Sequence, residues 1–320
     1  MSLGYHIDSV MLSETATNET FAEAIVILFI CVVVIVLNIL VIGTLITSRS
    51  VKEAMDFYIL SLAVADMLCG VLVIPLSAYP AITRKWMYGD FLCRITGYVE
   101  ITLWCVTVYT FIWIAVDRYL AVKKPLRYDT IQTRTRCQCW MVFTWITSMF
   151  LCCPPLLGFS KGKFYEDGYI CMLDLGNTLP YSITLSGLVL IPSIFTVIYT
   201  YVYIFSTMYK VKQCSNKDDK DYNTVLSENL SNPEHLMAFI LILLFWLSWL
   251  PWFSLHIYEQ INGRMKEGHH LHFWLLWLGI ADCFWKPIVY FVMSPKMRLG
   301  LKVFCMSLCC RSKARQQLVV

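Results

Sequence analysis

Seven long apolar blocks constrain this chain more than any other feature of its sequence. A helix that crosses a bilayer needs about 20 mostly apolar residues, and none of the blocks shows the alternation of a membrane β-strand. The chain is 58% hydrophobic and 15% charged, whereas soluble domains average about 45–50% and about 25%. Because a helix satisfies its own backbone in lipid, the sequence predicts an all-α membrane protein, a seven-transmembrane helix bundle. The expected spans are roughly residues 23–46, 57–80, 95–121, 138–158, 180–208, 236–257 and 271–293.

The distribution of Lys and Arg between the connecting segments predicts the orientation of the bundle. With the N-terminus outside, the inner segments hold 17 of these residues and the outer segments hold seven. Positive charge accumulates on the cytoplasmic side, so we expect a multi-pass protein of the cell membrane with its N-terminus outside. The predicted parts are an extracellular segment 1–22, a seven-transmembrane domain 23–294, and a cytoplasmic amphipathic helix and tail 295–320.

This orientation also predicts three kinds of covalent modification. Cys93 and Cys171 are the two cysteines expected to face an oxidising compartment, so they form the one plausible disulfide. Asn18 begins a glycosylation signal on the same side. On the inner side, cysteines that follow a basic amphipathic segment are expected to carry palmitate, with free thiols as the alternative. They are Cys305, Cys309 and Cys310.

The spans contain polar residues, tryptophans and prolines in a recognisable order. They are Asn38, Asp66, Asp117-Arg118-Tyr119, Trp145, Pro192, Trp249, Pro251 and, in the segment KPIVY, Lys286, Pro287 and Tyr290. Helix packing explains any one of them. Together they resemble the rhodopsin-like (class A) G-protein-coupled receptors over about residues 23–311, nearest the biogenic-amine receptors and their orphan relatives.

The resemblance implies a switch at the inner end of the third span. In that family the carboxylate beside the arginine, here Asp117, holds Arg118 in the resting state. The arginine meets the G protein when the sixth helix moves outward. Many related receptors add a carboxylate low on the sixth helix that clamps the arginine. Here we expect Ser231 in that position and Glu234 out of register, so the clamp is expected to be weak.

The same resemblance assigns the other activation residues and the partners. Trp249 couples the ligand to helix movement, and Pro251, which lacks an N–H, permits a bend. Tyr119, Pro287 and Tyr290 belong to the same set. The implied partners are a heterotrimeric G protein, arrestin, membrane lipids and a small-molecule ligand, with no nucleic acid and no cofactor.

Glu100 is the central candidate for ligand binding. It shares one helical stripe with Arg118, and a carboxylate within the membrane is a functional-site hypothesis by default. Amine receptors have an Asp at this spacing that pairs with the ligand ammonium, and aromatic faces add about 0.5–2 kcal/mol for a cation. The alternatives are pairing of Glu100 with Arg84, Lys85 or His256, and simple core packing of the aromatic residues. The other expected ligand contacts are Trp104, Ser182, Thr184, Ser186, Trp249, Trp252, Phe253, His256 and Trp277.

Lys286 stands where the family motif has Asn, deep in the seventh span. An unpaired lysine at the bilayer centre costs about 2.5–3.5 kcal/mol or more, so we expect it to pair with Asp66 and Asp282. The resemblance implies a sodium ion at Asp66, helped by a hydroxyl, here Thr107. We expect Lys286 to replace that ion as a tethered cation. The trio then has formal charge −1, or zero with a shared proton, and the alternative is a static salt bridge.

Two other functions stay open at this point. A receptor of the same fold could signal without a diffusible ligand if its second outer connection fills the pocket with Phe164, Tyr165 and Tyr169. A transporter or channel would use the three buried charges as an ion path, but it gives the Asp117-Arg118-Tyr119 sequence no role. An enzyme is not expected, because no metal-ligand cluster or nucleophile–base arrangement is evident in the sequence.

Overall fold

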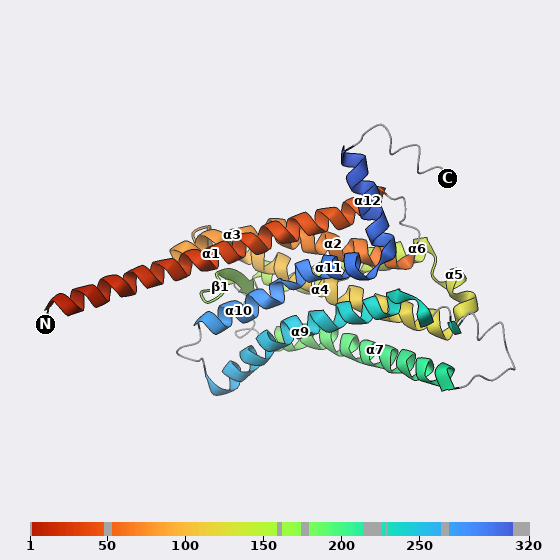
Figure 1. Ribbon diagram of the computed structural model, residues 1–320. Coiled ribbons are helices and arrows are strands. Elements are labelled where there is room, and N and C mark those ends of the chain that lie inside the picture. The colour runs from red at the N-terminus through yellow and green to blue at the C-terminus, as the bar shows by residue number, and fades with distance from the viewer. Residues whose placement is uncertain are drawn as a thin grey trace.

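The computed structural model describes residues 2–47, 53–158, 162–173, 179–213, 226–227, 230–263 and 269–309. Most of its helices lie side by side in one elongated bundle (Figure 1). The helices are α1 (Ser2–Thr47), α2 (Ala54–Leu72), α3 (Ile74–Thr83), α4 (Gly89–Lys123), α5 (Tyr128–Ile131), α6 (Arg134–Cys152), α7 (Leu179–Gln213), α9 (Pro233–Asn262), α10 (His269–Ile280), α11 (Asp282–Met293) and α12 (Pro295–Cys309). The strands are β1 (Gly162–Tyr165) and β2 (Ile170–Leu173).

All seven predicted spans are present. In the part of the chain that the structure describes, six helical segments are long and apolar enough to cross a membrane, and α10 with α11 forms a seventh. The segment Ala54–Thr83 joins α2 and α3 into one of these spans. Large apolar side chains cover the outside of the bundle, with Phe150 74% exposed and Phe195 72% exposed. Such a surface is suited to lipid and not to water, so the predicted fold class is confirmed.

The seventh span is bent by 42° between α10 and α11, which the sequence did not predict. Pro287 in α11 has no N–H to donate to the carbonyl of Cys283, one turn earlier. The side-chain amide of Asn38 on α1 donates to that carbonyl instead, at 3.0 Å. Just before the bend, a Cβ on Gly279 would lie 2.9 Å from the ring of Trp249, so glycine permits this close packing of α10 on α9.

Helices α1 and α12 extend past the two ends of the bundle (Figure 1). The N-terminal half of α1 projects beyond the end that carries the strands, and α12 lies across the opposite end. Lys296 at the start of α12 is held by Asp56 of α2, with both carboxylate oxygens 2.9 Å from Nζ. Cys305 is exposed on α12, whereas the side chains of Asn18 and Cys309, and all of Cys310, lie outside the described residues. Glycosylation and palmitoylation therefore stay predictions.

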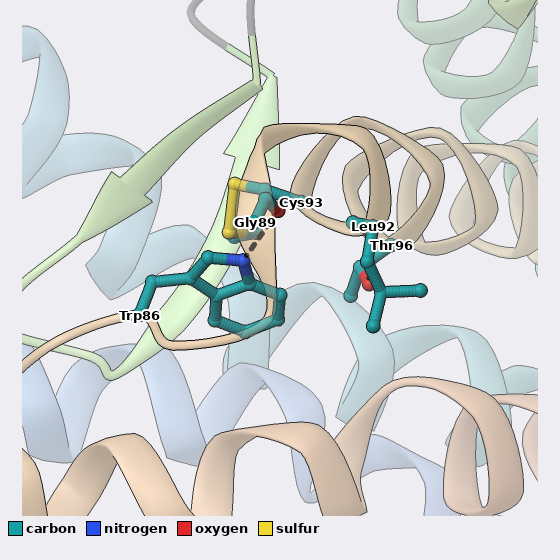
Figure 2. The surroundings of a disulfide bond; sticks show 6 residues. Trp86, Gly89, Leu92, Cys93 and Thr96 are labelled. Atoms are coloured by element: carbon teal, nitrogen blue, oxygen red, sulfur yellow. Dashed lines mark hydrogen bonds between the residues drawn. A yellow bond between two sulfur atoms is a disulfide. The ribbon is translucent and has the colours of Figure 1, made fainter.

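A disulfide fastens the β1–β2 hairpin to the start of α4. Cys171 on β2 is bonded to Cys93 on α4, as predicted. Figure 2 shows the indole of Trp86 beside this bond, where its Nε1 donates to the carbonyl oxygen of Gly89 at 2.9 Å. The hairpin thereby lies over the end of the bundle, which we call the outer end; the end that carries Arg118 is the inner end.

Candidate functional site

Glu100 and Trp104 lie one turn apart on α4 and both have unused hydrogen-bonding capacity. Glu100 is partly buried, and no hydrogen bond or ion pair joins it to Arg84, Lys85, His256 or any other described side chain. The indole Nε1 of Trp104 is buried and has no acceptor within the same part of the structure. A carboxylate and an N–H so placed can bind the cationic and the hydrogen-bond-accepting parts of one small ligand.

Aromatic side chains of α9 surround Trp104. Its ring centroid lies 5.8 Å from that of Phe253 and 6.3 Å from that of Trp249. Phe245, one turn of α9 closer to the inner end, is 6.1 Å away. Rings at such distances can present their faces to a cation, and they also pack well against one another as a core. The cluster is compatible with both of the expected roles, ligand contact and core packing.

The outer hairpin engages the other two predicted tryptophans. Tyr165 lies edge-on to Trp252, with 5.2 Å between ring centroids. The Nε1 of Trp277 donates to the carbonyl oxygen of Gly168 at 3.1 Å. A Cβ on Gly168 would collide with α10, so the turn approaches that helix as closely as glycine permits. His256 stacks on Trp252 at 6.0 Å. Trp252 and Trp277 therefore contact the protein's own loop.

Tyr169 anchors the same loop on α1. Its side chain is 1% exposed, and its hydroxyl donates to Oε2 of Glu23 at 2.7 Å. Burial raises the pKa of the Tyr169 phenol, and the neighbouring Glu23 carboxylate raises it further. Phe164 instead packs on Trp86, with 6.1 Å between ring centroids. The loop is thus held on α1, α9 and α10 at once.

Two of the three hydroxyl candidates on α7 do not face the interior of the bundle. Thr184 and Ser186 are exposed on the outer surface of α7, and Thr184 donates to the carbonyl oxygen of Pro180 in its own helix at 2.7 Å. Ser182 is partly buried. This corrects the expectation that all three face the ligand. The register of α7 turns the apolar neighbours Leu185 and Val189 into the bundle instead, both being buried.

At the inner end, Arg118 is held by two carboxylates. It is 3% exposed, and its Nε lies 3.0 Å from Oδ2 of Asp117. Its Nη1 lies 2.6 Å from Oε2 of Glu234. The expectation of a weak clamp with Glu234 out of register is wrong. Helix α9 begins at Pro233, which places Glu234 in its first turn facing Arg118, while Ser231 precedes the helix and donates to Ser227.

Two residues that the sequence analysis missed complete this network. The hydroxyl of Tyr128 donates to Oδ1 of Asp117 at 3.0 Å, and Nε2 of Gln132 donates to the same oxygen at 2.7 Å. Burial raises the pKa of the Tyr128 phenol. Both residues come from the connection after α4, and their spacing from Asp117 carries no signal that could identify them. They couple this connection to the arginine switch.

In the middle of the bundle, Lys286 lies between Asp66 and Asp282. Its Nζ is 2.8 Å from Oδ1 of Asp66 on α2 and 2.8 Å from Oδ2 of Asp282 on its own helix. All three side chains are almost completely buried. The expected contacts of the lysine are therefore present, and Thr107 on α4 is buried as well. Tyr290, one turn after Lys286, is also fully buried.

A sodium ion does not fit beside this lysine. The ammonium group lies in hydrogen-bond contact with the carboxylate of Asp66 that the resemblance assigns to the ion. A second cation there would be repelled by the ammonium at short range in a medium of low dielectric constant. The ammonium group of Lys286 thus occupies the place that a bound sodium ion would need beside Asp66.

The chain is similar in sequence to a known family of receptors and to several of its members. The family model described as "7 transmembrane receptor (rhodopsin family)" matches residues 37–290. Octopamine receptor 1 of Lymnaea stagnalis is 35% identical over 133 residues, which are 42% of this chain and 21% of that receptor. Octopamine receptor Oamb of Drosophila melanogaster is 35% identical over 186 residues, 57% of this chain and 27% of that receptor. The chain thus aligns with only about a quarter of these two relatives. The human Histamine H2 receptor is 25% identical over 322 residues, 97% of this chain and 86% of that receptor.

Proposed function

Because the chain belongs to the rhodopsin family of seven-transmembrane receptors, multi-pass proteins of the cell membrane, we propose that it transmits a signal from a small cationic ligand to a heterotrimeric G protein. The ligand enters from the outer end and pairs with Glu100. The movement passes through Trp249 to the arginine switch at the inner end. Arrestin and lipid-modified α12 belong to the same proposal.

One observation carries the ligand assignment: Glu100 has no partner among the described side chains, although it lies within the bundle. A carboxylate at this depth is costly unless a positive charge neutralises it. The unpaired N–H of Trp104 and the nearby rings of Trp249 and Phe253 fit an amine that also carries an acceptor. The similar receptors from Lymnaea, Drosophila and human are named for octopamine and histamine, which are amines.

A panel of biogenic amines tests this function in cells that express the chain. Second messengers are measured without ligand and with each amine, and parent cells that lack the chain serve as the control. We expect a saturable response to at least one amine. The absence of any response, in cells with the receptor at their surface, would contradict the assignment of an amine ligand.

The contacts of the outer loop favour a second candidate function. Tyr165 on Trp252 and Gly168 on Trp277 occupy two of the predicted ligand contacts. In this alternative the loop itself acts as the activating element, and the receptor signals without a diffusible ligand. The same cells distinguish the two functions. High signalling without amine, lowered by Tyr165→Ala, supports the loop, whereas low signalling that an amine raises supports the ligand.

Removing the carboxylate of Glu234 should raise ligand-free signalling. The Glu234→Gln substitution keeps the side-chain size but removes the charge that lies 2.6 Å from Arg118, so α9 is released more easily from α4. A loss of about 1–2 kcal/mol would shift the ratio of active to resting receptor roughly 5- to 30-fold. Second messengers are compared at equal surface expression. Ser231→Ala is the matched control and should change nothing, and equal signalling in both variants would exclude a clamp at Glu234.

A further inference from the structure

Two histidines at the start of α10 each lie beside a carboxylate of a neighbouring helix. Nδ1 of His270 is 3.5 Å from Oε1 of Glu23 on α1, and Nε2 of His272 is 2.8 Å from Oε1 of Glu259 on α9. Residues two positions apart on a helix point in directions about 200° apart, so the two pairs attach α10 to a different helix on each side. Both pairs lie at the outer end of the bundle, where α10 begins beside the strands (Figure 1).

The carboxylates of these pairs are largely shielded from water. The side chains of Glu23 and Glu259 are 6% and 12% exposed, and that of His272 is 2% exposed. A shielded charge is costly by itself, but an opposite charge in direct contact offsets that cost. A neutral imidazole offers a carboxylate only a hydrogen bond, whereas an imidazolium also offers a positive charge. Histidine is the side chain that ordinarily changes its charge between about pH 5 and 8.

The same pairs hold the outer loop. Glu23 accepts a hydrogen bond from the hydroxyl of Tyr169 at 2.7 Å, and the ring of Tyr165 lies 6.2 Å from that of His272. The loop over the outer end is therefore attached to both histidine pairs. The other charged or titratable groups around them, from α3, β1, α9 and the loop, are Arg84, Lys163, His256 and Asp167.

We propose that extracellular protons bind at His270 and His272 and hold α10 against α1 and α9, with the outer loop closed over the bundle. Each proton comes from the external water and makes the contact an ion pair, which is stronger than a contact between a carboxylate and a neutral ring. The carboxylate stabilises the imidazolium only while the helices touch, so proton binding and helix contact favour each other. This contribution is present at about pH 6 and is lost as the pH rises above neutral.

Melting temperatures of the purified receptor in lipid nanodiscs test this proposal, and they require neither an amine nor a G protein. We compare the wild type with the double variant His270→Gln and His272→Gln, because every other titrating group is common to both. Lowering the pH from about 7.5 to about 6 should raise the melting temperature of the wild type by about 2–4 °C relative to the double variant. His235→Gln, the same substitution at the inner end of α9, is the matched control and should respond as the wild type does.

Two single variants keep the test decisive if the double variant does not fold. The side chain of His270 is 59% exposed, so both variants are expected to fold. His270→Gln should lose part of the pH response. His270→Lys carries a charge that persists at neutral pH, so it should melt higher than His270→Gln at about pH 7.5 and should also show a reduced response.

Two results would overturn the proposal. One is an equal pH response in the wild type and in the double variant, or in the wild type and His270→Gln if only the single variant folds. The other is a response that His235→Gln lowers as much as the outer substitutions do. Either result would make the two histidine pairs packing contacts that bind no proton in this range of pH.

Discussion

Replacing Lys286 by methionine is expected to destabilise the folded receptor by about 3–5 kcal/mol, because removing one partner of a buried ion pair leaves an uncompensated charge. Two carboxylates, of Asp66 and Asp282, each 2.8 Å from Nζ in the native protein, would then face each other without a cation. Methionine fills most of the same volume, so the loss reports charge and not a cavity. The melting temperature of the purified variant and its fraction at the cell surface measure the effect.

Neutralising the carboxylates supplies the control for this prediction. A triple variant, Lys286→Met with Asp66→Asn and Asp282→Asn, has no charge in the core and should recover most of the lost stability, since an uncharged replacement of a buried ionic cluster is often tolerated. If the single and triple variants melt at the same reduced temperature, the side chain of Lys286 stabilises the bundle through packing and the electrostatic account is wrong.

Replacing Glu100 by glutamine is expected to weaken the response to a cationic ligand roughly 30-fold to more than 10³-fold, the equivalent of about 2–5 kcal/mol for one partner of a desolvated charge pair. The amide keeps the size of the side chain but cannot neutralise an ammonium group. Glu100 has no pairing role with another described side chain, so folding and surface expression should be preserved. Concentration–response curves on wild type and variant, at matched surface expression, give the change in potency.

Thr184→Ala is the matched control for the ligand site. Thr184 is exposed on the outer face of α7 and donates to its own helix, so its replacement should leave the potency within about twofold. If Glu100→Gln leaves the potency unchanged, Glu100 does not bind the ligand. A large loss in Thr184→Ala would show that α7 binds ligand in a register different from the one in the structure.

The arginine switch shows where sequence reasoning failed. The resemblance to the family places Ser231 at the clamp position, but Ser231 precedes α9 and Glu234 makes the contact. The start of α9 depends on Asn232, whose side chain accepts from the backbone N–H of Glu234 at 2.9 Å. Residues one turn apart share a face only while the helix is continuous, and the break at Asn232 separates Ser231 from α9. The place of that break decided which side chain meets Arg118.

The prediction that the hydroxyl groups of α7 face the ligand failed for a related reason. A span surrounded by lipid on most sides has a weak polar–apolar pattern, so Thr184 and Ser186 gave no sign of which face they occupy. The stripe on α4 was easier to predict, because Arg118 and Glu100 mark the inward side of one long helix. The disulfide was predictable as well, since orientation alone singled out Cys93 and Cys171.

The sequence alone determined that the chain crosses the membrane seven times and that Lys286 needs acidic partners, because both follow from the cost of exposing charge or backbone to hydrocarbon. That cost depends on composition and segment length, which can be counted along the chain. Tertiary structure alone decided which atoms meet: Glu234 on Arg118, the outer loop on Trp252 and Trp277, and the bend before Asp282. These contacts join segments far apart in the sequence, and they depend on helix rotation and packing, on which local patterns carry little information.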